Sequence, residues 1–480
     1  MLSLRPWKLS DLLSLLAPLG AKRGDGGEED PLLLGACADS REVSPGGLFC
    51  AIRGAVADGK DFIPQALAAG TAAILTDSPE VSASVPVIQV PAGQGYIATG
   101  RVAEAFADFP CRRLRLAGVT GTAGKTTTVF LLREILRAAG IPTGMVGTVV
   151  YDLGRGEELP ADRTTPTPFL LQELFARMVA NGVETVVMEC SSAALTQERT
   201  GTARFAAAAF TNFSRDHLDF HGTMEAYWEA KAKLFRTMLL PEATAVLNGD
   251  DPAVERLARE LVASPQAVCQ RLVIFSLKGT PSPWKCPLPG AFNQYNALCA
   301  GLMARALGVP EAVIAQTLAR TTGAPGRLQR FACPNGAQAF VDYAHTPEEL
   351  RCALQALRPE CPGRLGVLFG CGGDRDRGKR PLMAREAGEN ADFLWLTSDN
   401  PRTEDPVAIL EEVRAGVPAG VSFQVEVDRR KAIAAAVAAC APEDWLLIAG
   451  KGHEAYQEIQ HVKHPFSDWE VLRELFPLKP

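Results

Sequence analysis

The sequence lacks several features that would mark a specialised class of protein. Its 12 cysteines are scattered singly and never form C-x-x-C, so neither a zinc-ligand pattern nor a dense disulfide framework is predicted. No apolar run reaches about 18 residues, so no transmembrane helix is expected. A dense Lys/Arg block is also absent, and the formal net charge is −6. Because phosphate neutralisation dominates nucleic-acid binding, nucleic acid is not the expected main partner.

The rest of the composition is that of soluble globular domains. Charged residues make up 22% of the chain and hydrophobic residues 47%, which excludes a disordered chain or a coiled coil. The apolar stretch from Leu12 to Ala21 contains Pro18 and follows Asp11, and its leucine spacing fits an amphipathic helix better than a secretory signal. We therefore expect a cytoplasmic protein, without a membrane partner, and predict a monomer.

At roughly 150 residues per domain, a chain of 480 residues is long enough for about three domains. Residues 1–91 alternate strand-like runs at 47–52, 72–76 and 85–90 with a helical stretch at 64–69, which predicts a small α/β domain. Residues 92–326 contain a strand, a glycine-rich turn and a helix, the order of an α/β nucleotide-binding core, and end at a Pro/Gly breaker. Residues 327–480 alternate short apolar strands, at 339–341, 365–369, 393–397 and 445–449, with helical patterns such as 347–357, which predicts a Rossmann-like domain with a mainly parallel sheet.

A glycine-rich loop between the strand at 114–119 and the helix at 126–139 carries the clearest chemical signal. Its backbone N–H groups can hold phosphates at a helix N-terminus, while Lys125 would reach the β- and γ-phosphates and Thr126 would ligate Mg²⁺. Val119 replaces the usual first glycine, so the loop is a shortened variant. A chance G-K-T is the alternative, but the flanking strand and helix favour an ATP or GTP site. The predicted nucleotide contacts in the loop are Gly121, Thr122, Ala123, Gly124, Lys125, Thr126 and Thr127.

Polar residues follow two further predicted strands. Glu189 closes the apolar strand at 183–189, where a P-loop fold commonly places the carboxylate that holds the metal, although an exposed acid is the alternative. His217 and His221, two of only six histidines, lie within five residues in a segment rich in Asp and Asn. Neutral imidazole can ligate a metal or handle a proton, whereas a lone histidine is more often structural. The local density of such residues favours function.

Together these patterns resemble the ATP-dependent Mur ligase family of peptidoglycan synthesis. The resemblance covers nearly the whole chain, with matching patterns in the family's order from residue 39 to residue 454. The patterns are Asp39-Ser-Arg41, the 121–127 loop, Thr164-Thr-Pro166, Glu189-Cys-Ser-Ser192, residues 211–222, Tyr227-x-x-x-Lys231, Gly290 to Asn296, Gly326-Arg327, Asp342 to Pro347, Gly370 to Arg375, Asp399-Asn-Pro-Arg402 and Gly450 to Glu454.

The resemblance implies a three-domain α/β ligase that uses ATP and Mg²⁺ to join a carboxylate to an amine. ATP would phosphorylate the terminal D-glutamate carboxylate of UDP-N-acetylmuramoyl-L-alanyl-D-glutamate, and an amino acid would attack the acyl phosphate through its amine. Lys125, Arg327 and Mg²⁺ would offset the repulsion between the two anions. The other implied contacts are Thr126 and Glu189 to one metal, His217 to a second, Asn293 and Asn296 to adenine, and Asp342 to ribose.

Lys231 is assigned a role by the resemblance alone. Taken by itself, it is one lysine in the predicted helix at 227–235, and a solvated charge is the simpler interpretation. An ammonium group beside Mg²⁺ would be repelled, whereas a lysine carbamylated by CO₂ is an anion that can ligate or orient the metal. The family pattern therefore implies a carbamate at Lys231.

The remaining implied residues recognise the two substrates. The Arg402 guanidinium can bind a carboxylate through two hydrogen bonds but would repel the distal ammonium of lysine. It therefore favours meso-diaminopimelate, whose distal end carries a carboxylate as well as an ammonium. In the family, Asp-Asn-Pro-Arg is the pattern associated with diaminopimelate addition; alternatively, Pro401 makes a turn and Arg402 is solvated. The amino-acid contacts are Arg375, Asp399, Asn400, Pro401, Arg402, Gly450 and Glu454. The nucleotide-substrate contacts are Ser40 near uridine, Ala55, Val56 and Ala57 near the diphosphate, and Thr164, Thr165, Ser191, Gln197 and Arg199 along the muramoyl dipeptide.

Three residues depart from the family pattern. Ala123 and Arg163 stand where asparagine is usual, and Ala193 stands where histidine is usual. An active enzyme is still expected, because the metal and phosphate residues are retained.

Three alternative functions stay open. They are an L-lysine-adding ligase, a folylpolyglutamate synthase-like ligase, which should lack the Asp39-Ser-Arg41 and Asp399-to-Arg402 patterns, and an inactive nucleotide-binding regulator. Since the amine and phosphate sites are assigned to different domains, we also expect the last domain to close over ATP.

Overall fold

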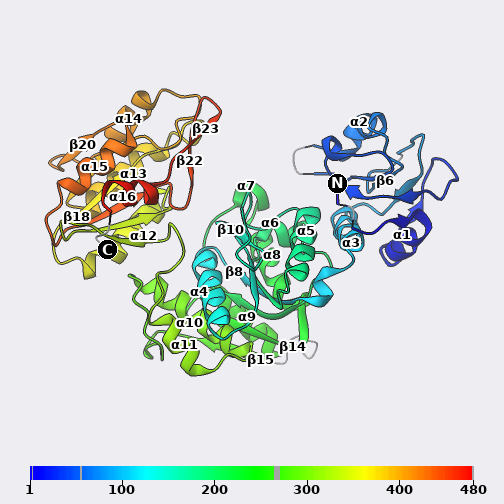
Figure 1. The fold of residues 1–480 in the computed structure, drawn as a ribbon, viewed down its shortest axis with the longest axis horizontal. Helices are drawn as coiled ribbons and strands as arrows, with labels where there is room; N and C mark the ends of the chain where they lie inside the picture. The colour runs from blue at the N-terminus through cyan, green and yellow to red at the C-terminus, as the bar shows by residue number, and fades with distance from the viewer. Residues whose placement is uncertain (3, 55–56, 80, 264–270, 478–480) are drawn as a thin grey trace. The chain divides into compact units, whose positions relative to one another are not determined.

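The structure is a computed structural model that describes residues 1–2, 4–54, 57–79, 81–263 and 271–477 (Figure 1). The chain packs into two compact units, Met1–Pro283 with Leu298–Thr317 and Trp284–Ala297 with Leu318–Pro480. Within the described ranges, no helix has both the length and the apolar character needed to cross a bilayer. The three-domain boundaries after residues 91 and 326 stay predictions.

The first unit begins with a five-stranded sheet in the order β2-β7-β6-β5-β4. Strands β4 to β7 run parallel, and β2 pairs antiparallel with β7. Strands β5 and β6 are buried along their whole length, which is why they read as continuous apolar runs. The predicted strands at 47–52, 72–76 and 85–90 and the helix at 64–69 are confirmed. The elements are β1 (Trp7–Lys8), α1 (Leu9–Leu16), β2 (Lys22–Arg23), β3 (Leu32–Leu33), β4 (Ala36–Cys37), β5 (Leu48–Ala51), α2 (Ile63–Ala68), β6 (Ala73–Thr76), β7 (Val87–Gln89) and α3 (Gly95–Phe106).

The amphipathic helix predicted on the stretch 12–21 is α1, which begins and ends earlier, at Leu9 and Leu16. It buries Leu9, Leu12 and Leu16, and a short 3-10 turn containing Pro18 follows it. These leucines share one core with α3, whose Val102 and other apolar side chains are buried there. The helix therefore covers the first sheet, which is the role that its leucine spacing predicts.

An eight-stranded sheet forms the rest of the first unit, in the order β11-β10-β9-β12-β8-β13-β14-β15. The six strands from β9 to β15 in this order run parallel, and the hairpin partners β10 and β11 are antiparallel. Strand β8 lies between β12 and β13, so the residues that follow these three strands meet at one sheet edge. The strands are β8 (Arg115–Thr120), β9 (Thr143–Val146), β10 (Val150–Asp152), β11 (Glu158–Pro160), β12 (Thr185–Glu189), β13 (Phe205–Phe210), β14 (Leu239–Asn248) and β15 (Arg271–Phe275).

Helices pack against this sheet and carry several of the predicted site residues (Figure 1). The Phe210 ring of β13 stacks on Phe235 of α8, with ring centroids 5.8 Å apart and planes at 7°, which fixes that helix against the sheet. The helices are α4 (Lys125–Ala138), α5 (Pro168–Ala180), α6 (Ser192–Thr196), α7 (Leu218–His221), α8 (Met224–Thr237) and α9 (Pro252–Ala263), followed by α10 (Ala291–Ala306), whose residues are divided between the two units, and α11 (Glu311–Leu318).

The second unit has a six-stranded sheet in the order β16-β17-β21-β18-β19-β20. All neighbours are parallel except the edge pair β16–β17, so the predicted mainly parallel sheet is confirmed. The elements are β16 (Gln329–Ala332), β17 (Gln338–Asp342), α12 (Pro347–Leu357), β18 (Leu365–Phe369), α13 (Lys379–Asn390), β19 (Phe393–Leu396), α14 (Pro406–Arg414), β20 (Phe423–Val425), α15 (Arg429–Ala438), β21 (Trp445–Ala449), the hairpin β22 (Tyr456–Ile459) and β23 (Val462–Pro465), and α16 (Asp468–Leu475).

Candidate functional site

The glycine-rich loop connects the C-terminal end of β8 to the first turn of α4. Gly121 has a φ of +149° and Gly124 a φ of +84°, which are backbone conformations that favour glycine. A Cβ on Gly121 would lie 1.9 Å from Thr211 Oγ1, so the close approach of the two segments also requires glycine. The sequence therefore builds a tight turn that directs the α4 N-terminus toward the sheet edge.

Asn212, two residues after β13, holds this loop through its backbone and side chain. Its carbonyl oxygen accepts the N–H of Thr122 at 2.9 Å, and its Oδ1 accepts the N–H of Ala123 at 2.9 Å. The first i→i−4 bond of α4 runs from the Thr128 N–H to the Gly124 carbonyl at 3.0 Å, so the N–H groups of residues 125–127 are the donors best suited to a phosphate. The Ala123 N–H is engaged by Asn212, and this contact does not involve the side chain at which Ala123 departs from the family's asparagine.

Two lysines of the first unit converge on one carbonyl oxygen of the loop. Lys125 Nζ donates to the carbonyl oxygens of Gly121 and Thr122, each at 2.9 Å. Lys231 Nζ donates to the same Gly121 oxygen at 2.7 Å. Lys231 is only 1% exposed, and burial, followed by repulsion from Lys125, holds its pKa well below the usual value. The interpretation of Lys231 as a solvated surface charge is therefore wrong.

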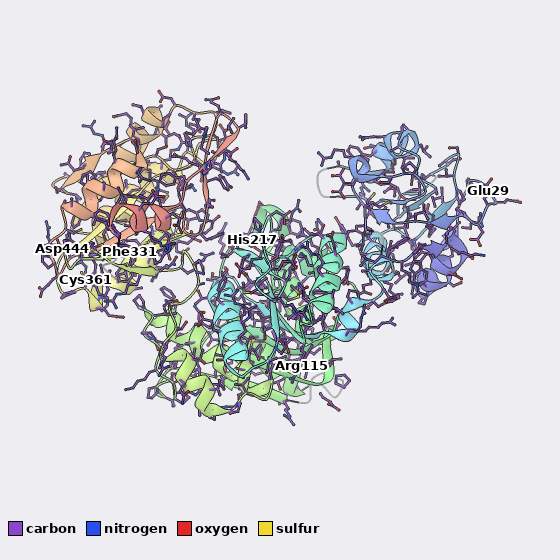
Figure 2. The ribbon with its side chains drawn as sticks, in the orientation of Figure 1. Glu29, Arg115, His217, Phe331, Cys361 and Asp444 are labelled. Carbon is purple, nitrogen blue, oxygen red and sulfur yellow. The ribbon has the colours of Figure 1, made fainter. Side chains whose placement is uncertain are left out.

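Lys231 and His217 contact the same aromatic ring. The Lys231 ammonium lies 4.6 Å from the Tyr227 ring centroid, and the His217 ring is 5.8 Å from Tyr227. His217, labelled in Figure 2, precedes α7, adopts a φ of +51° and keeps a half-exposed side chain, with Nε2 3.5 Å from Asp216 Oδ2. The structure thus brings two of the four residues that the resemblance assigns to metal binding to the same ring.

The imidazole of His221 is hydrogen-bonded to Ser192. Its Nε2 lies 2.9 Å from Ser192 Oγ, and its ring is 5.1 Å from Tyr227. Burial lowers the pKa of His221, and repulsion from His217 and Lys231 lowers it further, so the neutral imidazole is favoured. This histidine is hydrogen-bonded within the fold, whereas His217 faces solvent.

Glu189 is a buried carboxylate at the end of β12, beside Val119 of β8. Its Oε2 accepts the Thr126 hydroxyl at 3.0 Å and the Thr148 hydroxyl at 3.2 Å, and its Oε1 accepts the Thr148 N–H at 2.8 Å. The alternative of an exposed acid is therefore wrong. Sequence reasoning missed Thr148, because only the parallel pairing of β9 with β12 brings the residues that follow β9 to this carboxylate.

The Thr126–Glu189 pair supplies the oxygen ligands that suit Mg²⁺. Among the described residues, no cluster of three or more His, Cys, Asp or Glu side chains could hold a metal unaided. Mg²⁺ keeps several waters and commonly binds one or two carboxylates together with substrate phosphates. The hydroxyl and carboxylate therefore fit a metal that arrives with a nucleotide.

The first unit also contains a cavity of about 620 Å³. Four predicted substrate residues line it, namely Ser40, Ala57, Gln197 and Arg199. Ala55 and Val56 lie outside the described residues. The further lining residues are Ala38, Asp39, Arg41, Phe49, Cys50, Ile52, Gly59, Phe62, Gln65, Tyr96, Thr99, Arg163, Thr167 and Pro168.

A chain of hydrogen bonds links this cavity to Glu189. Arg199 donates from Nη1 to the Thr165 carbonyl at 2.7 Å, and the Thr165 hydroxyl donates to the Glu189 carbonyl at 2.8 Å. Thr164 Oγ1 lies 3.0 Å from Thr148 Oγ1, which itself contacts Glu189. The predicted peptide residues therefore extend from the cavity to the strand end beside the phosphate loop.

Ser191, the other predicted peptide residue, has a structural contact. Its hydroxyl caps α6 by accepting the Ala194 N–H at 3.3 Å, and its own N–H donates to Thr165 Oγ1 at 3.1 Å. Ala193, which departs from the family pattern, lies in the same short helix.

The second unit holds the other predicted nucleotide residues. Asn293 donates to the Pro289 carbonyl at 2.8 Å, and its Oδ1 accepts from Asn296 at 3.3 Å. Asp342 is buried and accepts the N–H groups of Leu328 and Ala344 at 2.7 and 2.8 Å; burial raises its pKa despite these donors and Arg327.

Arg327 has a buried Nε with no hydrogen-bond partner in the described part of the chain, and its guanidinium lies 4.9 Å from the Tyr343 ring centroid. Gly326 has a φ of +65°, and a Cβ there would lie 2.2 Å from the His453 nitrogen. The glycine therefore lets the segment before Arg327 pass close to the loop after β21.

Polar side chains from the predicted amino-acid site meet at the carboxyl ends of β19 and β21. Asn400 donates from Nδ2 to Glu454 at 2.9 Å, and the fully buried Lys451 donates to Asn400 Oδ1 at 3.1 Å and Glu454 Oε2 at 3.0 Å. Gly450 has a φ of +112°, and a Cβ there would lie 2.6 Å from Asp399 Oδ2. The structure therefore brings Asp399, Asn400, Gly450 and Glu454 together.

Arg402 is not solvated, so that alternative is wrong. Its side chain is 18% exposed and donates to Glu458 Oε2 at 3.1 Å and to the Gly373 carbonyl at 2.7 Å. Arg375 is exposed and contacts the Asp374 carbonyl at 3.3 Å. Sequence reasoning missed Lys451 and Glu458, although Lys451 stands inside the glycine-rich pattern of 450–454.

The two units define a class of protein, a multidomain α/β enzyme with a P-loop-type phosphate site. The Mur ligase family profiles match residues 35–113 (catalytic domain), 119–270 (middle domain) and 326–452 (glutamate ligase domain). The chain belongs to the Mur ligase family.

Relatives of similar length carry one shared name. The chain is 45% identical to UDP-N-acetylmuramoyl-L-alanyl-D-glutamate--2,6-diaminopimelate ligase of Gloeobacter violaceus, with 92% of this chain and 93% of the relative covered. It is 41% identical to the protein of the same name from Chlorobaculum tepidum, with 98% and 97% covered. A solved structure of that name superposes with a TM-score of 0.64 at 32% identity, covering 92% of this chain and 94% of the other.

Proposed function

We propose that this protein is an ATP-dependent cytoplasmic ligase that adds meso-diaminopimelate to UDP-N-acetylmuramoyl-L-alanyl-D-glutamate in peptidoglycan precursor synthesis. The observation that carries the proposal is the convergence of Lys125 and Lys231 on the Gly121 carbonyl, beside the buried Thr126–Glu189 pair. Two ammonium groups at one point repel each other, so the site favours either a bound anion such as a triphosphate or the loss of one charge, which falls on the buried Lys231. The relatives' shared name supplies the substrates.

In the first proposed step, a D-glutamate carboxylate oxygen attacks the γ-phosphorus of ATP and ADP leaves. Both reactants are anions, so positive charge must be in place before they approach. Lys125, whose Nζ lies 2.9 Å from the Thr122 carbonyl of the loop, would bind the phosphates. Arg327, whose buried Nε has no hydrogen-bond partner among the described residues, would add positive charge from the second unit. Asn293, Asn296 and Asp342 would hold the nucleoside.

Mg²⁺ would neutralise phosphate charge and orient the oxygens when bound. Thr126 and Glu189 would hold one ion, because their oxygens already meet at 3.0 Å. His217 would contribute to a second ion, together with Lys231 as its carbamate. A lysine reacts with CO₂ as the neutral amine, and the lowered pKa of Lys231 favours that form.

In the second proposed step, the amine nitrogen of the amino acid attacks the acyl carbon, phosphate leaves, and the nitrogen loses a proton. Arg402 would bind the distal carboxylate of meso-diaminopimelate, as its guanidinium already holds the Glu458 carboxylate. Glu454 would take the distal ammonium, Arg375 the other carboxylate, and Asp399, Asn400, Pro401 and Gly450 would shape the site.

A panel of amino acids tests the proposal. The purified protein is supplied with ATP, Mg²⁺, UDP-N-acetylmuramoyl-L-alanyl-D-glutamate and meso-diaminopimelate, L-lysine or L-glutamate, and both phosphate release and product mass are measured. We expect product with meso-diaminopimelate, dependent on both substrates. A preference for L-lysine would reject the amino-acid assignment. In a parallel reaction a folate replaces the UDP-dipeptide, and glutamate addition to it would indicate a folylpolyglutamate synthase-like ligase. No nucleotide turnover with any amine would indicate an inactive regulator.

A further inference from the structure

The cavity of the first unit contains more positive than negative charge. Three arginines line it, Arg41, Arg163 and Arg199, and among its described lining residues Asp39 is the one carboxylate. Asp39 already pairs with Arg41 at 2.6 Å. The Asp39 carboxylate is therefore already neutralised by Arg41. Arg163 and Arg199 bring two further guanidinium groups to the cavity.

Arg199 is held in a fixed direction by neutral acceptors. Its Nε and Nη2 donate to Gln197 Oε1 at 2.9 and 2.7 Å, and its Nη1 donates to the Thr165 carbonyl at 2.7 Å. These contacts satisfy hydrogen bonds but add no negative charge. Burial and then repulsion from Arg163 lower the pKa of Arg199, so the two guanidinium groups oppose each other in the free protein.

Arg163 has a hydrogen-bonded backbone and a loosely paired side chain. Its N–H donates to the Tyr151 hydroxyl at 3.1 Å, and that hydroxyl also contacts Asp162 Oδ1 at 2.6 Å. The Arg163 side chain is 54% exposed, and its ion pair with Asp162 is long, 3.8 Å from Nε to Oδ2. A guanidinium with one loose partner can turn to a ligand in the cavity without breaking a strong contact.

We propose that Arg163 and Arg199 together bind an anionic group of the acid substrate, either a phosphate or a carboxylate, which makes Arg163 a substrate-binding residue that the family's usual asparagine does not provide. The inference rests on the proposed function, whose nucleotide substrate carries both kinds of anion. Paired guanidinium forks match phosphate and carboxylate oxygens, and an anion between them turns their repulsion into attraction. Arg163 adjoins Thr164, so it lies at the end of the cavity that the hydrogen-bond chain connects to Glu189.

Calorimetric binding to the full-length protein tests this role. UDP-N-acetylmuramoyl-L-alanyl-D-glutamate, UDP and N-acetylmuramoyl-L-alanyl-D-glutamate are titrated into wild-type protein, Arg163→Asn, Arg163→Lys and the control Arg320→Asn, which changes an exposed arginine of the second unit. We expect Arg163→Asn to weaken binding of the nucleotide substrate by about 10-fold or more, because a charge-assisted hydrogen bond is lost. The affinity of Arg163→Lys should lie between those of wild type and Arg163→Asn, and the affinity of Arg320→Asn should equal that of wild type.

The two smaller ligands identify the anion. A parallel loss of UDP affinity assigns the diphosphate to Arg163, whereas a loss confined to the muramoyl dipeptide assigns a carboxylate. Because Arg163 opposes Arg199 in the free protein, Arg163→Asn should leave the melting temperature without ligand unchanged or raise it, while reducing the shift that the substrate produces. A purely structural arginine would instead lower the melting temperature without ligand.

Unchanged affinity of Arg163→Asn for all three ligands, or an equal loss in Arg320→Asn, would overturn the inference. Product formation by the wild-type protein separates this result from a failure of the proposed function. If wild type makes product but Arg163→Asn binds normally, only the role of Arg163 is wrong. If wild type neither binds the nucleotide substrate nor makes product, the proposed function itself is contradicted.

Discussion

At the scale of single residues, the environment of an ionisable group decides its chemistry more than its type does. Lys231 stands on an ordinary amphipathic helix, yet its ammonium is buried beside Lys125 and over Tyr227. A charge placed there is opposed both by desolvation and by a like charge. The side chain is therefore suited to neutral-amine chemistry, and the carbamate proposed for it would reverse the sign of the charge.

Replacing Lys231 tests that role. Lys231→Ala should lower turnover by about 10²–10³-fold, as when a preorganised electrostatic contact to the reacting groups is removed. A small carboxylate added to the assay should partly restore activity, because it can occupy the volume and supply the charge of the carbamate. Initial rates with and without the added carboxylate measure both effects. Lys431→Ala, which changes an exposed lysine on α15, is the control, and full activity of Lys231→Ala would contradict the proposal.

Glu104 gives a pH-dependent prediction. This buried carboxyl on α3 accepts the Thr202 N–H at 2.6 Å and the Thr202 hydroxyl at 2.7 Å, and burial raises its pKa above the ordinary value of 4.5. Between the ordinary and the raised pKa, the native state binds more protons than the unfolded state. The free energy of unfolding should therefore fall as pH rises through that window.

Glu104→Gln should remove this fall, so the difference in unfolding free energy between the variant and wild type should shift in favour of the variant with rising pH. Urea unfolding at steps from about pH 4 to about pH 7 measures it. Glu173→Gln, at an exposed position on α5, should keep the wild-type slope. Parallel profiles for wild type and Glu104→Gln would contradict the assignment.

At the scale of elements, long apolar patterns were predictable and short pairings were not. The strand at 365–369 and the helix at 347–357 match β18 and α12 at both ends, because each has a clear apolar period and a turn or cap beside it. The edge strands β10 and β11 have three residues each, and their antiparallel pairing depends on the neighbouring strand β9 rather than on their own sequence. Thr148 and Glu458 could not be placed at the site for the same reason, since only the fold brings them to Glu189 and Arg402.

A buried ion pair fixes two elements of the second unit. Arg429 at the start of α15 and Asp468 at the start of α16 are both 0% exposed and pair at 2.7 Å, and Arg429 also donates to the Ala449 carbonyl at 2.9 Å. Asp468→Asn would leave a buried guanidinium without its counter-charge, so the unfolding free energy should fall by about 3–5 kcal/mol.

The same two helices supply the control for this prediction. Arg430 and Glu474 also pair at 2.7 Å between α15 and α16, but their side chains are 48% and 56% exposed. Glu474→Gln should therefore change the unfolding free energy by less than about 1 kcal/mol. Denaturant unfolding of both variants measures the contrast, and equal effects would show that burial does not set the cost of losing this contact.

At the scale of the whole molecule, the proposed reaction needs groups from both units. Lys125 and Glu189 belong to the first unit, whereas Arg327, Arg375 and Arg402 belong to the second. Amide formation requires the amine nitrogen within about 3 to 3.5 Å of the activated carbon. The substrates therefore have to hold the two units in one arrangement during the reaction, which makes ligand-dependent closure the expected behaviour.

Small-angle scattering can measure this closure. Profiles are recorded for the free protein, with UDP alone, and with a non-hydrolysable ATP analogue, Mg²⁺, the UDP-dipeptide and meso-diaminopimelate together. We expect a smaller radius of gyration only in the last mixture, because UDP is proposed to bind the first unit alone and gives the units no shared ligand. Lys125→Met, which should weaken phosphate binding, should reduce the change at the same ligand concentrations. Identical dimensions with and without the full set of ligands, under conditions where calorimetry shows the sites filled, would mean that the units meet without closing and that closure does not limit the reaction.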